Sequence, residues 1–206
     1  VKDAKIRDIK VNNAGSAIFV AQSDGKIIVF NPQQQSRLEF YGHSHSVNSL
    51  DIDDTGTWAL SMADDYSALY WHAQSGEVKY KYTMPSRIHF GKILSNELAL
   101  ISTTTEQQIV NLITGTVNNR LASDEKTYTS SAYFYAEKGY LLTGHSQQQL
   151  KLWHVNSGKL IKSWQAQAKS SRAFDGGMIQ SIAIDHDYPY IVSQSSIGLT
   201  EYWKIP

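Results

Sequence analysis

The feature that most constrains this chain is a repeat of about forty residues. The clearest copy is residues 42–76, which hold strand-like runs at 46–52, 57–63 and 67–71 and lead into a fourth run at 77–82. These runs alternate apolar with polar residues or are mostly apolar, and turns containing Asp and Gly separate them. The unit is therefore predicted to be four short antiparallel strands.

Weaker copies of this unit cover the rest of the chain. They align on the last core residue of the third strand, and the aligned positions are Phe30, Trp71, Val110, Trp153 and Trp203. Subtraction gives spacings of 41, 39, 43 and 50 residues. We predict one domain over residues 1–206, with units at about 5–41, 42–82, 87–121, 128–164 and 179–206 and an insertion loop at 165–178. The fifth unit ends after its third strand, so its outer strand is lacking.

A glycine recurs in the turn between the third and fourth strands. It stands five residues after the aligned position in units two, three and four, as Gly76, Gly115 and Gly158. Glycine tolerates the left-handed conformation that closes such a hairpin. Unit one has Gln35 there, after Asn31 and Pro32. We therefore expect its loop to be built differently.

The period, the four strands per unit, the Gly42-His43 pair and the Trp at the end of the third strand resemble the WD-repeat β-propeller family. The resemblance implies an all-β fold, a β-propeller of four-stranded antiparallel blades. It also implies a hydrogen-bonded network inside the blade, which maps onto His43, Ser61, Asp65 and Trp71. Unit four keeps Thr143 and Trp153 but has Gln147 at the Asp position, so unit two alone is expected to have a full network.

Propellers of the WD-repeat family mostly have seven blades, so the resemblance also implies that this chain is the C-terminal part of a longer ring. Upstream blades would complete it; the alternative is a five-bladed ring closed by a short substitute. An open arc would expose apolar blade faces and strand edges. Self-association of the isolated chain is therefore expected.

Composition and charge exclude several classes. Lys plus Arg and Asp plus Glu are 19 each, so no net charge draws the chain to nucleic acid. No apolar run is long enough to span a membrane. The absence of cysteine removes disulfides, thiolate metal sites and a cysteine nucleophile. The Gln-, Ser- and Asn-rich composition inclines the interpretation toward a bacterial cell-envelope protein; the compartment is otherwise unknown.

Catalytic and metal sites are not indicated. His43 and His45 lack a companion carboxylate cluster, and the paired carboxylates near Asp53 and at Asp64 and Asp65 lie in turns, where Asp is favoured for local hydrogen bonding. No nucleophile elbow, phosphate-binding loop or dinucleotide motif is present. We therefore predict no catalytic residue, no cofactor and no metal.

The sequence favours a non-catalytic scaffold that binds a protein or peptide through one propeller face. By the resemblance, the turn residues and the loops that enter each first strand face one side of a propeller. The predicted face consists of His45, Asp64, Arg87, Tyr128, Ser146 and Arg172. The alternatives are a propeller that binds or hydrolyses a small molecule or sugar in its central channel, and a purely structural blade array. The first strands offer Asn48, Asp51, His89, Lys92, Ser131 and Ser181 for a channel site, without an obvious catalytic set.

Overall fold

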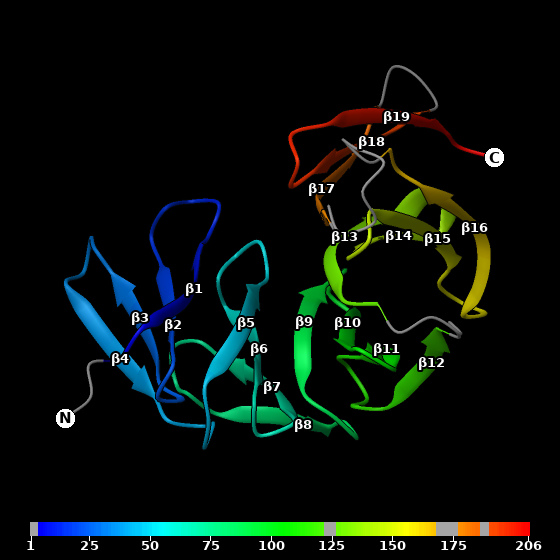
Figure 1. The fold of residues 1–206 in the computed structure, drawn as a ribbon. Helices are drawn as coiled ribbons and strands as arrows, with labels where there is room; N and C mark the ends of the chain where they lie inside the picture. Colours follow the sequence, from blue (N-terminus) through cyan, green and yellow to red (C-terminus); the bar gives the residue numbers. More distant parts are fainter. Residues whose placement is uncertain (1–3, 122–126, 168–176, 186–189) are drawn as a thin grey trace. The chain divides into compact units, whose positions relative to one another are not determined.

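The fold was analysed in a computed structural model that describes residues 4–121, 127–167, 177–185 and 190–206. It is all-β, with five antiparallel sheets whose strands follow one another in chain order (Figure 1). Blade 1 contains β1 (Ile6–Val11), β2 (Ile18–Gln22), β3 (Ile27–Asn31) and β4 (Ser36–Phe40). Blade 2 contains β5 (Val47–Ile52), β6 (Trp58–Ala63), β7 (Ser67–His72) and β8 (Val78–Thr83). Blade 3 contains β9 (Ile88–Ile93), β10 (Leu98–Thr103), β11 (Gln107–Asn111) and β12 (Val117–Leu121).

The last two sheets differ in strand number. Blade 4 contains β13 (Thr129–Tyr135), β14 (Tyr140–His145), β15 (Gln149–His154) and β16 (Lys159–Gln165), with a short 3-10 helix, η1 (Ala136–Lys138), between its first two strands. Blade 5 contains only β17 (Ile179–Ile184), β18 (Tyr190–Ser195) and β19 (Thr200–Lys204) among the described residues. The predicted fold class, with five blades and an incomplete last one, is confirmed.

The hairpin between β3 and β4 corrects one expectation. Gln35 has a φ of 51°, so it takes the left-handed conformation itself, and the loop is not built differently. The glycines of the other hairpins have similar values, 71° for Gly76, 76° for Gly115 and 67° for Gly158. The Asn31 side-chain oxygen accepts hydrogen bonds from the backbone N–H groups of Gln33 and Gln34, both at 3.0 Å. The Gly115 hairpin has the same two bonds, from the N–H groups of Ile113 and Thr114 to Asn111 Oδ1, both at 2.8 Å. The two turns are therefore closed in the same way, with Gln35 or Gly115 in the left-handed conformation.

Within each unit the core lies between consecutive sheets. One face of blade 1, with Phe19 and Phe40, packs on Leu50 and Trp71 of blade 2. The opposite face of blade 2 packs on blade 3, and blade 4 packs on blade 5 in the same way. A middle blade is therefore buried on both faces, which explains its nearly continuous apolar strands, such as β6.

The first strand of every blade carries a β-bulge at the same place. The pairing with the second strand skips the second residue of each first strand, and the skipped residues are Arg7, Asn48, His89, Ser130 and Gln180. A bulge bends the strand and redirects the side chain of the extra residue. All five redirected side chains are polar.

The described residues form two compact units. One contains the described residues up to 104 together with 110–117, and the other contains 105–109 together with the described residues from 118 onward. Within the first unit β5 lies beside both β1 and β9, and within the second β17 lies beside β13. The single domain over residues 1–206 and its blade limits stay a prediction, and most of the 165–178 loop lies outside the described residues.

One face of blade 1 is uncovered. Ile6, Ile9 and Val11 of β1 are 60%, 50% and 53% exposed. The matching residues of blade 2, Val47 and Leu50, are buried against blade 1. Self-association through this face stays a prediction. No helix in the described part of the chain is long and apolar enough to cross a membrane.

Candidate functional site

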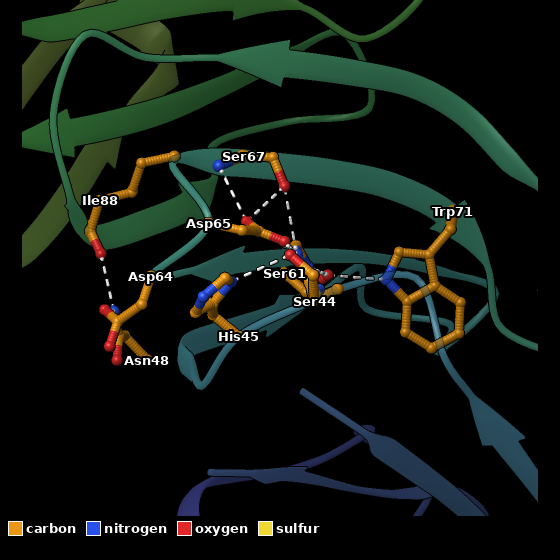
Figure 2. Close-up of polar contacts among 10 residues, drawn as sticks. Ser44, His45, Asn48, Ser61, Asp64, Asp65, Ser67, Trp71 and Ile88 are labelled. Carbon is orange, nitrogen blue, oxygen red and sulfur yellow. Dashed lines mark hydrogen bonds and ion pairs between the residues drawn. The ribbon is translucent and has the colours of Figure 1, made fainter. Parts of the chain in front are cut away.

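The four residues assigned to a blade network lie in one hydrogen-bonded chain in blade 2. Figure 2 shows Ser61, Asp65 and Trp71 of this chain. The His43 ring is bound through Nδ1 to Asp65 Oδ2 at 3.1 Å and through Nε2 to Ser61 Oγ at 2.8 Å. The Trp71 indole N–H donates to the same Ser61 oxygen at 3.1 Å. Ser67 adds a hydroxyl that donates to Asp65 Oδ1 at 2.6 Å. These hydrogen bonds link the loop before β5 to the turn between β6 and β7, and link β6 to β7.

The pKa shifts of His43 and Asp65 favour a neutral imidazole beside an ionised carboxylate. Burial lowers the pKa of His43, although Asp65 opposes the shift. Burial by itself would raise the pKa of Asp65, but hydrogen bonds from Ser67 and the Ser44 N–H outweigh it and hold the pKa below its usual range. A neutral His43 that donates from Nδ1 to the Asp65 carboxylate and accepts from Ser61 at Nε2 satisfies every contact. The arrangement joins the loop that holds His43 to Ser61 of β6 and to Trp71 of β7.

Blade 4 has a second network that the sequence analysis missed. The Trp153 indole N–H donates to Thr143 Oγ1 at 2.8 Å, and this oxygen lies 2.8 Å from His145 Nε2. His145 Nδ1 lies 3.2 Å from Thr127 Oγ1. The expectation that unit two alone has a full network is therefore wrong in part. An imidazole supplied by β14, two residues after Thr143, takes the place of one supplied by the entering loop.

Replacement of His43 by alanine is expected to lower the free energy of unfolding by about 1–3 kcal/mol, because buried partners lose a hydrogen bond. Gln147→Ala is the matched control. Gln147 stands at the Asp position of blade 4 and is exposed, so it should cost no more than about 0.5 kcal/mol. Urea unfolding of both variants measures the difference. Equal losses would contradict a stabilising network at His43.

The unfolding free energy should also depend on pH through His43. Its pKa is lowered in the folded chain, so below about pH 6.5 the unfolded chain binds more protons and stability falls as pH drops. His43→Gln should reduce this slope between pH 5 and 7. Burial also lowers the pKa of His89 and raises that of Asp51. Both residues are present in both proteins, so their contributions to the slope cancel in the comparison. An unchanged slope would show that His43 titrates normally.

Two members of the predicted partner face meet in the first unit. Arg87 donates from Nε and Nη2 to the two carboxylate oxygens of Asp64, and Asn48 donates to one of them. Asn48 also donates to the Ile88 carbonyl at 3.2 Å (Figure 2). Burial alone would raise the pKa of Asp64, but the bonds from Arg87 and Asn48 hold it below its usual range. The exposed His45 has its Nδ1 3.0 Å from the Ser44 hydroxyl.

Arg7 and His89 belong to the same surroundings. The charge of Arg7 contributes to lowering the pKa of Asp64. Burial, and then the charge of Arg87, lower the pKa of His89. We call these bulge residues and their ion pair the rim cluster: Arg7, Asn48, Asp64, Arg87 and His89. Sequence reasoning omitted Arg7 and considered Asn48 and His89 only for a channel site, because a bulge is a property of strand pairing.

The other predicted face residues lie in the second unit or outside the described residues. Ser146 Oγ accepts the Tyr128 N–H at 3.1 Å, and the Tyr128 carbonyl accepts the Ser146 N–H at 2.8 Å. Ser23 holds the Lys5 N–H in the same way at 2.9 Å, and Ser196 holds that of Met178 at 3.0 Å. This repeated serine therefore anchors the start of the blade. The Tyr128 side chain is 49% exposed, and Arg172 lies outside the described residues.

A metal centre does not emerge from the described residues. In that part of the chain, no three His, Asp or Glu side chains lie together in a way that could hold a metal ion. Asp51 was considered for a channel site, but its Oδ2 accepts the Ile93 N–H of the next blade at 2.8 Å. This carboxylate joins two blades.

Comparison with known proteins shows similarity to WD-repeat proteins. Residues 34–72 match the family model described as WD domain, G-beta repeat. The chain is 23% identical over 180 residues to eukaryotic translation initiation factor 3 subunit I of Meyerozyma guilliermondii, covering 80% of this chain and 52% of the relative. It is 22% identical over 185 residues to the same subunit of Schizosaccharomyces pombe, covering 82% of this chain and 56% of the relative.

The fold has a solved counterpart. The crystal structure of the Myceliophteria thermophila Cps50 (Swd1) beta-propeller domain superposes with a TM-score of 0.76 at 13% identity, covering 100% of this chain and 68% of that one. The chain spans about half the length of the initiation-factor relatives. These relatives are eukaryotic, so they give no support to the inclination toward a bacterial envelope protein.

Proposed function

Because the chain is a WD-repeat β-propeller protein, we propose that it is a non-catalytic scaffold that binds a protein or peptide through the rim cluster. The observation that carries this proposal is the bulge at the second residue of every first strand. In the first unit it places Arg7, Asn48 and His89 on three neighbouring strands. Bulges are over-represented at sheet edges, at the rims of barrels and next to active sites, where they redirect a side chain or end the strand pairing.

The chemistry of the rim cluster suits a polar partner. The Arg87 side chain is about half exposed while it binds Asp64, and Arg7 is exposed as well. Both guanidinium groups are therefore accessible to a partner. Arginine is enriched at protein interfaces because its planar fork recognises carboxylates and backbone carbonyls. The pairing with Asp64 holds the Arg87 fork in one orientation, which reduces the entropy lost on binding.

The relatives suggest the kind of partner. The initiation-factor relatives are named as a subunit, which is a component of a multi-protein factor. A propeller that contributes surface to such an assembly needs polar loops and no shared catalytic residues. We infer that the partner of this chain is another protein of a multi-subunit assembly.

A channel site for a small molecule or sugar is less favoured. Its best carboxylate candidate, Asp51, accepts the Ile93 N–H. Burial raises the pKa of Asp51, and the charges of Lys92 and Lys10 oppose this rise. A group committed to joining blades is poorly placed to act as an acid or base. The engagement of Asp51 therefore favours the scaffold over a hydrolase with Asp51 as its acid or base.

Affinity capture followed by direct binding measurement tests the scaffold. A partner captured from a eukaryotic extract with the wild-type chain would be purified and titrated by calorimetry. The variant Arg7→Ala/Arg87→Ala/His89→Ala should weaken binding at least ten-fold. The matched variant Lys138→Ala/Lys159→Ala, which removes exposed charges from blade 4, should leave it unchanged. Equal affinity of both variants would show that the rim cluster is not the binding face.

A further inference from the structure

The first strands of blades 1 and 3 carry basic residues at the same three positions. Pairing with the second strand defines these positions in every blade: the residue before the first pair, the bulged residue, and the third residue after the bulge. In β1 they are Lys5, Arg7 and Lys10, and in β9 they are Arg87, His89 and Lys92. We call these six residues the basic cradle, because β1 and β9 lie on either side of β5.

The other first strands have no basic residue at these positions. The residues there are Ser46, Asn48 and Asp51 in β5, Tyr128, Ser130 and Tyr133 in β13, and Met178, Gln180 and Ala183 in β17. All five strands form the same bulged pairing, so the fold does not require basic residues at these positions. Their concentration on β1 and β9 therefore indicates a role other than folding.

Positive charge is in excess in the basic cradle. Its three lysines and two arginines have five formal positive charges, while burial and the charge of Arg87 lower the pKa of His89 and favour the neutral imidazole. The carboxylates of Asp8, Asp51 and Asp64 interact with these cations. Three negative charges do not balance five positive ones, so the cradle attracts an anionic group.

The cations of the cradle are more available than its carboxylates. Asp8 accepts the Leu50 N–H at 2.9 Å, and Asp51 accepts the Ile93 N–H at 2.8 Å. Lys5 and Arg7 are exposed and Lys92 is half-buried, and within the described part of the chain their side chains have no ion pair and no hydrogen bond. A partner can therefore bind these three cations without breaking an existing contact.

The spacing of the cations selects an extended ligand. Lys5 and Lys10 are separated by roughly 13 Å along β1, at about 3.3 Å per residue with one residue taken up by the bulge. A single phosphate or carboxylate reaches only one end of this distance, whereas an extended chain with several anionic groups spans it. The cradle positions hold no Phe, Tyr or Trp ring on which the bases of a single-stranded nucleic acid would stack. These features favour a peptide over a nucleic acid.

We propose that the basic cradle binds an extended acidic segment of the protein partner, with glutamate or aspartate side chains at several positions. Lys5 and Arg7 bind carboxylates on one side of β5, and Lys92 binds them on the other. This inference rests on the proposed function and names the chemistry of the partner. Because exposed charges attract one another less strongly in salt, the affinity should fall several-fold between about 50 and 300 mM sodium chloride.

The test uses the full chain and a fluorescein-labelled octa-glutamate peptide, with binding followed by fluorescence anisotropy. The octa-glutamate peptide should bind saturably, and an octa-glutamine peptide of the same length at least ten-fold more weakly. An octa-thymidine oligonucleotide provides the nucleic-acid arm and should also bind more weakly than octa-glutamate. Equal affinity for octa-glutamine, or tighter binding of octa-thymidine, would overturn the proposal.

Variants outside the rim cluster assign the binding to the cradle. Lys5→Gln/Lys92→Gln should weaken octa-glutamate binding at least five-fold, and Lys5→Arg/Lys92→Arg, which keeps the charges, should restore it. The matched variant Lys138→Gln/Lys159→Gln in blade 4 should bind octa-glutamate like the wild type. Equal losses in the two glutamine variants would overturn the assignment to the cradle.

The captured partner separates this inference from the proposed function. It should bind Lys5→Gln/Lys92→Gln more weakly than the wild type. Wild-type affinity for this variant, together with loss of binding in Arg7→Ala/Arg87→Ala/His89→Ala, would overturn the acidic segment and leave the scaffold function standing. Wild-type affinity for both variants would count against both proposals.

Discussion

Replacement of Trp71 by alanine is expected to lower the free energy of unfolding by about 3–5 kcal/mol. The Trp71 side chain is 0% exposed, stacks on Phe40 with centroids 4.0 Å apart, and meets the edge of Phe19 at 6.4 Å. Removal of the indole leaves a cavity between blades 1 and 2 and deprives Ser61 of a donor. Urea unfolding followed by circular dichroism measures the loss.

Trp203→Ala is the matched control for Trp71. Trp203 is the equivalent residue of blade 5 and donates to Ser193 at 2.8 Å, but it is only partly buried. Its loss should cost about half as much or less, because transfer and cavity terms scale with the buried surface. Trp71→Phe, which keeps most of the apolar contact, covers the case in which the alanine variant does not fold. Similar costs at Trp71 and Trp203 would contradict the assignment of Trp71 to a tightly packed blade junction.

Gly25→Ala is expected to lower the free energy of unfolding by about 2–4 kcal/mol, the sum of a left-handed backbone and a steric clash. Gly25 has a φ of 90°, and a Cβ atom there would lie 2.6 Å from the His43 carbonyl oxygen and 2.9 Å from that of His45. Both contacts are with backbone, so neither can be relieved by rotating a side chain. The loop that carries His43 must move.

Gly15→Ala separates the two contributions at Gly25. Gly15 also has a positive φ, of 66°, but nothing lies within 4 Å of its missing Cβ. Its substitution should cost only about 1 kcal/mol for the backbone conformation. The ring resonances of His43 should shift in Gly25→Ala and remain in place in Gly15→Ala. Equal stability losses would mean that the turn conformation alone, and not the close approach of blade 2, requires glycine at position 25.

The strands and their grouping could be predicted because they depend on local chemistry. In blade 2, alternating side chains and Asp-containing turns are readable over a few residues, and β6 and β7 lie within one or two residues of their predicted limits. The network of His43, Ser61, Asp65 and Trp71 could be assigned by resemblance because its spacing within one repeat matches the WD-repeat family. Closure of the hairpin was predicted where glycine marks it. It was mispredicted at Gln35, because a glutamine there takes the same left-handed conformation as the glycines.

The sequence by itself therefore determined the all-β fold, the five units with an incomplete last one, and the network of blade 2. The tertiary structure alone decided that His145 completes a network in blade 4 and that β-bulges occur at Arg7 and His89. Each of these depends on which residues of distant segments face one another. Pairing register and packing between blades are set by long-range contacts, which periodicity within one segment does not encode.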